Sequence, residues 1–431
     1  MINYISKEVK MLKFIFVFLF TISIAFISNA RELDLKYVHQ KAMSTSPLAK
    51  QRNYYKTIND LEKISTWTSY LPQFTIDAQG TYQSDVFELP FKLSIVTIPV
   101  VPKDQYKVTL NVNQMIWDGG VASINSDKSN IDMSVNNQQT EVNLFKVKEA
   151  INQIYFNILF LQENLKILEL VKFQLDTNKN VIESGVKNGV MLRSNLQNIE
   201  IEIIRTEQKI YENSSDRKAL LKMLAMWIEE ELASDVVLNI PNDLQKNTEI
   251  SNRPEYPYFE LKKKQIDNGK DLISSILNPK FFAFGQGSYG SPNQLNMFET
   301  TGSFFYIVGL KMQWMPFDWF NNSRKQEILE INKSFVNIEK ENFEKNLKIS
   351  LLKDDDDIDK YNTLIAKDEE ISTRQKFIVA EYFSKLKNNT ITITDYLNQF
   401  NQQTQTEISL RLHKLQKLNA IINLLTKSGN Y

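Results

Sequence analysis

The residue types that most often carry catalysis or hold metals are sparse in this sequence. The chain has no cysteine, and its only two histidines, His39 and His413, stand far apart along it. A zinc site usually needs several histidine or cysteine ligands at short spacing. We also find neither a phosphate-binding loop of the P-loop type nor a nucleophile elbow. The sequence therefore predicts no metal, no cofactor and no enzymatic activity.

A glycine-rich segment from Gly285 to Gly290 has the Gly-x-Gly-x-x-Gly spacing of dinucleotide-binding turns. Such a site needs a helix that begins directly after the turn, within a βαβ unit. Here Ser291-Pro292-Asn293 follows, and this sequence favours a loop. We interpret the glycines as small residues within a strand.

A dense acidic run extends from Asp354 to Asp357, with Asp359 close behind. Charge runs of this kind usually form the solvated face of a helix, and this is our first interpretation. The alternative is an acidic patch that lines a tunnel. Successive residues point in different directions around a helix, so the four acids cannot all face one lumen.

The overall charge balance gives no sign of a nucleic-acid partner. Lys+Arg and Asp+Glu both number 51, so the formal net charge is zero and no basic field is expected. After residue 30 no apolar run is long enough for a membrane-spanning helix. If the mature chain crosses a membrane, it must use strands in a closed barrel, because unpaired backbone groups are too costly in lipid.

Residues 1–30 have the organisation of a secretory signal peptide. Three lysines precede an apolar stretch over 14–27, and Ser28-Asn29-Ala30 provides small residues for cleavage. The alternative is a membrane anchor helix, but the stretch is shorter than the ~20 residues that a span needs. We expect an exported mature chain beginning at Arg31, with Met1 and Met11 both possible start sites.

An internal repeat organises the mature chain. Pro47 and Pro72 each lie 207 positions before another proline, Pro254 and Pro279. A turn at 187–189 has its counterpart 200 positions later at 387–389. We therefore predict two structural repeats of one plan, over residues 31–240 and 241–431.

Each repeat is expected to contain a helix, two strands, a very long helix and a return helix. In the first repeat the expected ranges are a helix over 34–69, strands over 73–85 and 105–117, a long helix from 121 to a turn at 185–190, and a helix over 192–231. In the second they are a helix over 255–277, strands over 281–290 and 303–315, a long helix over 321–386 and a helix over 392–427.

The long helices show coiled-coil periodicity. Apolar residues step alternately by three and four along the first one: Leu144, Val147, Ile151, Ile154, Ile158, Leu161, Leu165 and Leu168. Ile328, Ile331, Phe335 and Ile338 begin the same pattern in the second repeat. Neither long helix contains proline, and the first would run about 95 Å at the usual rise per residue. Helices of this length must pack against other long helices.

Three of the predicted strands alternate between apolar and polar residues, as a sheet with one apolar face requires, and the strand over 281–290 does so less cleanly. A soluble, half-buried sheet gives the same pattern, so alternation alone does not indicate a membrane barrel. Three tryptophans fall where a strand meets a long helix, namely Trp117, Trp314 and Trp319. They would suit an aromatic girdle at a membrane interface, and the alternative is that they cover a core.

In its order of elements, its duplication and the positions of its prolines and glycines, the sequence resembles the TolC-type outer-membrane efflux protein family. The segments that carry the resemblance are Ser46-Pro47, the stretch from Leu71-Pro72 to Gly80-Thr81-Tyr82, and the strand exits 114–120 and 311–318. It covers about 34–427. The family implies a mainly α fold with a β part. Duplicated long helices form a coiled-coil α-barrel, and four strands per protomer contribute to a trimeric twelve-stranded transmembrane β-barrel.

The resemblance also implies a function. The chain would be a homotrimeric channel-tunnel in the outer-membrane lipid, with its helical portion in the periplasm. It would act as a passive conduit for drug efflux, metal efflux or type I secretion, docking to a periplasmic adaptor (membrane fusion protein) and an inner-membrane transporter. Two loops, 86–104 and 291–302, would lie outside the cell, and the first of them is apolar. The alternatives are a periplasmic coiled-coil scaffold or adaptor without a channel and, from another class, a cell-wall hydrolase.

The family implies roles for the helix turns. The adaptor would dock on the turn residues Asn188, Gly189, Val190, Asn388, Asn389 and Thr390. Residues 394–398 match the stretch that places two acidic rings at the family's constriction: Asp395 keeps the first acid, whereas Asn398 replaces the second. Asn195 lies in the equivalent uncharged stretch of the first repeat. The alternative for Asp395 is an ordinary acid in the first turn of a helix, favoured by the helix dipole.

Overall fold

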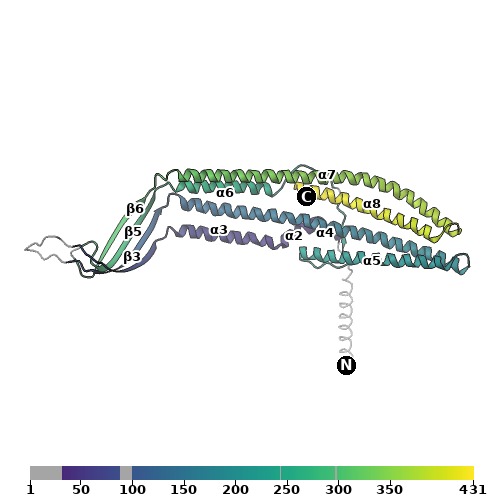
Figure 1. Ribbon diagram of the computed structural model, residues 1–431, viewed down its shortest axis with the longest axis horizontal. Helices are drawn as coiled ribbons and strands as arrows, with labels where there is room; N and C mark the ends of the chain where they lie inside the picture. Colours follow the sequence, from purple (N-terminus) through teal and green to yellow (C-terminus); the bar gives the residue numbers. More distant parts are fainter. Residues whose placement is uncertain (1–31, 88–99, 243, 297–298) are drawn as a thin grey trace, which may run out of the picture. The chain divides into compact units, whose positions relative to one another are not determined.

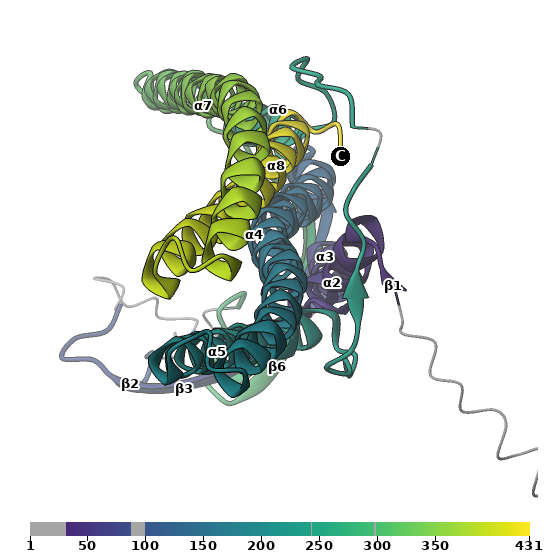
Figure 2. The same ribbon diagram turned by 90° about the vertical axis from the view of Figure 1, so that its right-hand side faces the viewer.

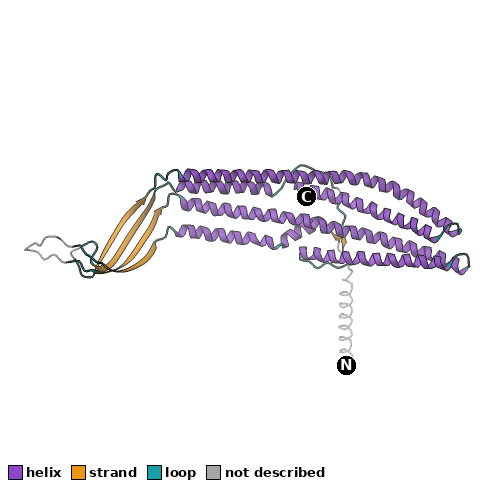
Figure 3. Ribbon diagram, in the orientation of Figure 1, coloured by secondary structure: helices purple, strands orange, loops and turns teal. Residues whose placement is uncertain are grey.

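The computed structural model describes residues 32–87, 100–242, 244–296 and 299–431, so the predicted signal peptide and most of loop 86–104 lie outside the described residues. Long helices and one four-stranded sheet make up most of the described chain (Figure 3). The chain divides into two compact units. We call them the sheet unit, residues 47–143 and 253–346, and the helical unit, the remainder. The two longest helices contribute one part to each unit.

The sheet unit contains four antiparallel strands in the order β2-β3-β5-β6 (Figure 1). Their bounds are β2 Gln73–Tyr82, β3 Asp104–Trp117, β5 Lys280–Ser291 and β6 Ser303–Gln313. These agree with the four predicted strands to within a few residues. The Gly285–Gly290 segment lies inside β5, so its interpretation as small residues in a strand is confirmed.

Four helical segments complete the sheet unit. Two are whole helices, α3 Gln51–Thr68 and α6 Glu255–Ser275. The other two are the first parts of α4 Val121–Lys187 and α7 Asn321–Lys387. Both long helices have 67 residues and begin 200 positions apart, as the predicted repeats require. The division of the chain at residue 240 stays a prediction.

The helical unit consists of α2 Leu35–Thr45, α5 Arg193–Ile228, α8 Ile393–Ser428 and the later parts of α4 and α7. α5 lies beside α4, and α8 beside α7, as two antiparallel hairpins (Figure 2). Ion pairs cross each hairpin, for example Lys179 to Glu200 at 3.0 Å and Lys414 to Glu369 at 2.7 Å. Among the described helices, none has the length and hydropathy of a membrane span.

The single helix predicted over 34–69 is wrong, because the chain breaks between α2 and α3. Ser46 adopts an extended ψ of 130°, and a short 3₁₀ helix, Pro47–Lys50, follows. Proline has no N–H to donate and disfavours a helical conformation in the residue before it. Pro47 therefore separates two helices, which fall in different units.

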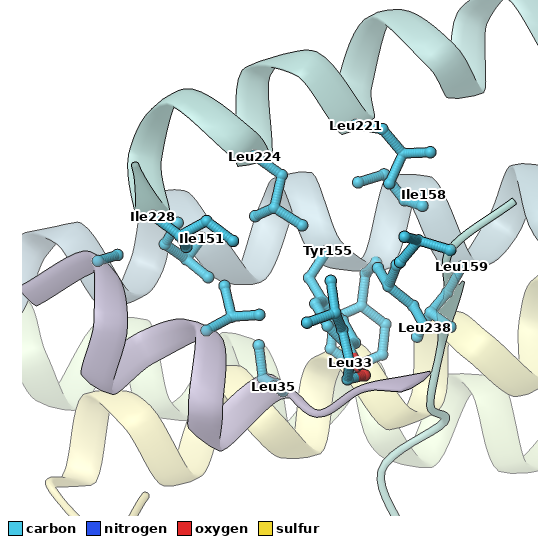
Figure 4. Close-up of a cluster of buried hydrophobic side chains, with 14 of the residues drawn as sticks. Leu33, Leu35, Ile151, Tyr155, Ile158, Leu159, Leu221, Leu224, Ile228 and Leu238 are labelled. Carbon is cyan, nitrogen blue, oxygen red and sulfur yellow. Dashed lines mark hydrogen bonds between the residues drawn. The ribbon is translucent and has the colours of Figure 1, made fainter. Parts of the chain in front are cut away.

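Figure 4 shows the main core of the helical unit, where α2, α4 and α5 meet. Leu35, Ile151, Ile158 and Leu224 are fully buried there. Tyr155 lies in the same cluster, and its hydroxyl is 2.7 Å from the carbonyl oxygens of both Leu33 and Asn239. It thus anchors a small parallel sheet, β1 Glu32–Leu33 with β4 Val237–Leu238, which the sequence did not predict.

The two predicted coiled-coil seams behave differently. In the first, Leu144, Ile151 and Ile158 are buried within the chain. In the second, Ile328 is 57% exposed and Phe335 58%, and Ile331 and Ile338 are similarly open. These four residues lie in the part of α7 that belongs to the sheet unit, and there they are largely uncovered. Further along α7, in the helical unit, Leu347, Leu351 and Ile358 are buried, as their counterparts in α4 are.

Candidate functional site

The sheet has one continuous apolar face. The strand register places Ile76 opposite Leu110, Leu110 opposite Gly287, and Gly287 opposite Tyr306, so one side of all four strands carries these residues. The face is open: Ile76 is 75% exposed and Leu310 is 80% exposed. On β2 and β3 the opposite face is mostly polar, with hydrogen bonds between Thr109 and Ser288 (2.9 Å) and from Asn111 to Asp77 (2.5 Å). On β5 and β6 the same face also carries Phe282, Phe284, Phe305 and Ile307. The predicted alternation is thus confirmed for β2 and β3, and it is weaker on β5 and β6; the apolar side is uncovered.

The sheet also has two open edges. Within the described chain, β2 pairs only with β3, and β6 pairs only with β5. An edge strand presents unpaired N–H and C=O groups, which need water or another strand as a partner. Among the described residues, the sheet thus has an uncovered apolar face and two unpaired edges.

The junctions between strands and long helices use one design in both halves. Asp118 accepts hydrogen bonds from the N–H groups of Gly120 (2.9 Å) and Ala122 (2.6 Å), and Asp318 accepts one from Asn322 (2.6 Å). Gly119 and Gly120 have φ of +80° and +92° between cap and helix. The equivalent positions of the second half have φ of +57° and +60°, yet they carry Trp319 and Phe320. Bulky residues are rare in this conformation, so the second junction holds its aromatics at a cost in strain.

The predicted interface aromatics lie at these junctions and are exposed. Trp314 donates from Nε1 to the carbonyl oxygen of Leu277 at 3.0 Å, which leaves its indole plane at the surface. Trp319 is 77% exposed, and its ring centroid lies 5.1 Å from that of Phe317. Trp117 is also exposed and lies near Phe281. All three are exposed, and their role at a membrane interface stays a prediction.

The helix turns predicted to dock a partner come together at one end of the helical unit. All six turn residues, Asn188 to Val190 and Asn388 to Thr390, are exposed. Gly189 has φ of +72° and Asn389 has φ of +57°, as expected for residues that tolerate the left-handed region. The Nδ2 group of Asn389 donates to the carbonyl oxygen of Val190 at 2.7 Å, so the two turns are linked directly.

Asp395, the predicted gate acid, forms the capping box of α8. Its Oδ2 accepts from the N–H of Thr392 (3.0 Å) and from the Thr392 hydroxyl (2.7 Å), and its own N–H donates back to that hydroxyl (3.1 Å). These hydrogen bonds lower the pKa of Asp395, so its exposed carboxylate is charged at neutral pH. This is the position that the helix-start interpretation expects, and the role of gate charge stays a prediction. Asn398 is exposed and Asn195 half-buried, each in the first turns of its helix.

Behind the turns lies a contact that the sequence interpretation did not assign. Tyr396 is buried, and its hydroxyl accepts a hydrogen bond from Asn178 Nδ2 at 2.6 Å, which joins α8 to α4. Its ring also packs against Phe383 and Phe400. A buried tyrosine usually needs a partner for its hydroxyl, which is the only sequence signal that could have indicated this link.

The acidic run is not a uniform solvated face, and that interpretation is wrong for Asp354. This residue is buried and pairs with Lys427 Nζ at 2.7 Å, and burial raises its pKa. Asp355 pairs with Lys246, and Asp357 pairs with Lys360. Asp356 and Asp359 remain exposed. The run therefore fastens α8 and the segment before α6 onto α7 within the helical unit.

The two histidines serve separate structural contacts. His39 is buried and lies 2.8 Å from Asn152 Oδ1, and His413 Nδ1 lies 2.5 Å from Asp368 Oδ2. In the part of the chain that the structure describes, no group of three or more His, Cys, Asp or Glu residues is placed to hold a metal ion.

Comparison with solved structures decides the fold. The channel protein CusC matches with a TM-score of 0.68 and 13% identity, over 94% of this chain and 93% of CusC. The outer membrane protein VceC of Vibrio cholerae matches with a TM-score of 0.64 and 10% identity, over 92% and 96%. The CmeC outer membrane channel of Campylobacter jejuni matches with a TM-score of 0.63 and 15% identity, over 92% and 85%. This chain has the outer-membrane channel fold.

No protein-family model and no curated protein matches the sequence. The outer-membrane channel fold is therefore recognised from structure, at identities too low to carry over function. It confirms the mainly helical fold with a small antiparallel sheet that the resemblance implied for one chain. Within this fold, the roles of the turn residues, of Asp395 and of the junction aromatics stay predictions.

Proposed function

We propose that three copies of this chain form a channel-tunnel in the outer membrane, with the helices in the periplasm. The observation that carries the proposal is the open sheet: a continuous apolar face, two edges unpaired in the described chain, and exposed aromatics where β3 and β6 lead into the long helices. A four-stranded sheet with open edges cannot stand alone in lipid, because its backbone groups would lack partners. Pairing of β6 in one copy with β2 of the next would close a twelve-stranded barrel around the polar face.

The helices of the sheet unit support the same assembly. The second seam on α7 is exposed, and α3 exposes a further apolar stripe that includes Tyr54, Leu61 and Ile64. Long apolar stripes on helices are normally covered by other helices. A neighbouring copy supplies helices of matching length, so both stripes would be buried in the trimer.

The channel would act as a passive conduit and not as an enzyme. Cargo would arrive from an inner-membrane transporter through a periplasmic adaptor, and the exposed helix turns would form the docking end. The linked turns and the capped, charged Asp395 support a closed and negatively charged constriction at that end. A periplasmic scaffold would have no use for an uncovered apolar sheet face.

The test is to express the full chain with its own N-terminal segment in a Gram-negative host and to follow where it goes. We expect it in the outer-membrane fraction, as a trimer resistant to mild detergent, with discrete conductance in planar bilayers. A water-soluble monomer in the periplasmic fraction would refute the proposal. A membrane-bound trimer that exports nothing would agree with the proposed channel but would contradict the role in export through an adaptor.

A further inference from the structure

A polar seam between two helices of the sheet unit stands out from the apolar packing elsewhere. On α3, the residues Tyr55, Ile58, Asn59 and Glu62 follow the spacing that places side chains on one helix face. On α4, Ser129, Asp132, Met133 and Asn136 do the same. A face by which one helix packs on another is usually apolar. These two faces carry carboxylates and amides instead, so packing alone does not account for them.

The two faces, with Gln265 of α6, line a pocket of about 230 Å³ that is open to solvent on one side, where Ile58 and Glu62 are exposed. Asn59 lines this pocket and is only 5% exposed, and its Oδ1 has no hydrogen-bond partner among the described residues. A buried acceptor without a partner carries a free-energy cost, so its retention calls for an explanation. An incoming donor at this position would remove that cost.

The two carboxylates of the pocket differ in their partners. Asp132 pairs with Lys128 Nζ at 2.6 Å and also accepts from Gln265 Nε2 at 2.6 Å. Glu62 accepts from the Ser129 hydroxyl at 2.6 Å, and no ion pair to it is found among the described residues. The pocket therefore presents one exposed carboxylate at its open side and one buried carbonyl oxygen, that of Asn59, without a partner among the described residues.

We propose that this pocket binds a small primary amine with an apolar body. An ammonium group has three N–H donors and no acceptor, which matches the Glu62 carboxylate and Asn59 Oδ1. Tyr55, Ile58 and Met133 supply apolar surface for the rest of the molecule. The volume lies below the ~300–1,000 Å³ typical of pockets for drug-sized ligands, so the occupant is a compact amine.

A divalent cation fits this pocket less well. Calcium takes about six to eight oxygen ligands, and magnesium demands near-octahedral oxygen geometry. Here one of the two carboxylates is already neutralised by Lys128, and the apolar side chains offer no ligands. The site does not depend on the proposed channel function, because all its residues lie within the sheet unit of one chain.

The test uses the purified full chain in detergent and benzylamine as the probe, with isothermal titration calorimetry at low ionic strength. Benzyl alcohol serves as the neutral probe of similar shape. A charge-assisted hydrogen bond contributes enough that we expect the alcohol to bind about tenfold more weakly than the amine. Glu62→Gln keeps the shape of the side chain and removes its charge, so it should weaken the binding of benzylamine by a similar factor.

Asp60→Asn is the matched control. Asp60 is exposed on the same helix but does not line the pocket, so its loss should leave benzylamine binding unchanged within about twofold, because exposed charges at a distance are screened. Equal binding of amine and alcohol would overturn the proposal. An equal loss of benzylamine affinity in Glu62→Gln and Asp60→Asn would also overturn it, because it would indicate general attraction to the surface. Displacement of benzylamine by magnesium would overturn it too, because it would indicate a metal site.

Discussion

Asn389 Nδ2 donates to the carbonyl oxygen of Val190 at 2.7 Å, across 199 positions of sequence. This hydrogen bond joins the turn between α7 and α8 to the turn between α4 and α5. The two hairpins of the helical unit are therefore tied at their ends within one chain. Any movement that separates the hairpins there must break this bond first.

Replacing Asn389 should loosen the two turns. Asn389→Ala removes the donor and also places alanine at φ of +57°, a left-handed conformation that asparagine tolerates better than alanine does. Asn389→Gly removes the donor but tolerates the backbone conformation. We expect faster amide hydrogen exchange over 186–191 and 386–391 in both variants, with the larger effect in Asn389→Ala.

Asn388→Ala is the matched control, because Asn388 is equally exposed and its side chain does not make this bond. If Asn389→Gly exchanges no faster than the wild type, the hydrogen bond does not hold the turns together.

The two roles predicted for Asp395 can be separated by mutation. Asp395→Asn removes the charge, whereas Thr392→Ala removes the hydroxyl of the capping box and keeps the charge. If Asp395 lines the constriction, Asp395→Asn should weaken block by multivalent cations several-fold in bilayer conductance, and Thr392→Ala should not. Equal, unchanged block in both variants would leave Asp395 as a helix cap alone.

The same carboxylate predicts a pH dependence. Its hydrogen bonds from Thr392 lower the folded-state pKa, so the cap contributes stability above the unfolded-state value and loses it as pH falls through the folded-state value. Fraying of the first turn of α8 should therefore set in only under strongly acidic conditions. Hydrogen exchange over 393–397 as a function of pH measures it.

Much of the fold could be predicted because local patterns set it. The long helices have no proline and carry a heptad pattern, and α7 begins at 321 and ends at 387, within one residue of the prediction. The alternation of apolar and polar residues predicted the strands to within a few residues. It also predicted which side chains share the apolar face of the sheet, since a shift of one residue would turn every side chain to the opposite face.

What could not be predicted depends on contacts between distant segments. The second seam on α7 has the same pattern as the first, yet only the structure shows that Ile328 and Phe335 lack a partner within the sheet unit. β1 and β4 are two-residue strands, too short for any alternation. The bond from Asn178 to Tyr396 joins residues 218 positions apart, and neither residue type indicates the other.

The glycines at the first strand–helix junction should differ in their tolerance of a side chain. Both have positive φ, so either Gly→Ala change costs about 1 kcal/mol. A Cβ on Gly119 would also lie 2.9 Å from Asn278 Cβ, whereas a Cβ on Gly120 meets nothing within 4 Å. We expect Gly119→Ala to lower the unfolding temperature clearly more than Gly120→Ala. Equal effects would show that Asn278 moves aside freely.

The second junction allows the opposite test. Phe320 holds a φ of +60° that glycine adopts without strain, so Phe320→Gly should stabilise the folded chain by about 1 kcal/mol. If its exposed ring anchors the barrel at the membrane interface, the same change should reduce the fraction of protein inserted into liposomes. A variant that is more stable and inserts equally well would leave the strained aromatic without a membrane role.

The buried histidine predicts how stability responds to mild acid. Asn152 Nδ2 donates to Thr426, so its Oδ1 is an acceptor and His39 Nε2 carries the proton in a neutral ring. Burial lowers the pKa of His39 to about 4, with nearby Lys148 adding to the effect. In the unfolded chain the ring takes up a proton near pH 6.5. The unfolded state then binds more protons than the folded state, so stability is full above about pH 6.5 and falls as pH drops towards 4.

His39→Gln removes this titration and keeps a donor for Asn152. Loss of one differential proton corresponds to about 1.4 kcal/mol per pH unit, so the wild type should lose stability more steeply than the variant between about pH 6.5 and pH 4. Chemical denaturation followed by circular dichroism over this range gives both slopes. Because the two proteins share every other titrating group, parallel slopes would mean that His39 is protonated in the folded chain, and the buried contact with Asn152 would then have to open in mild acid.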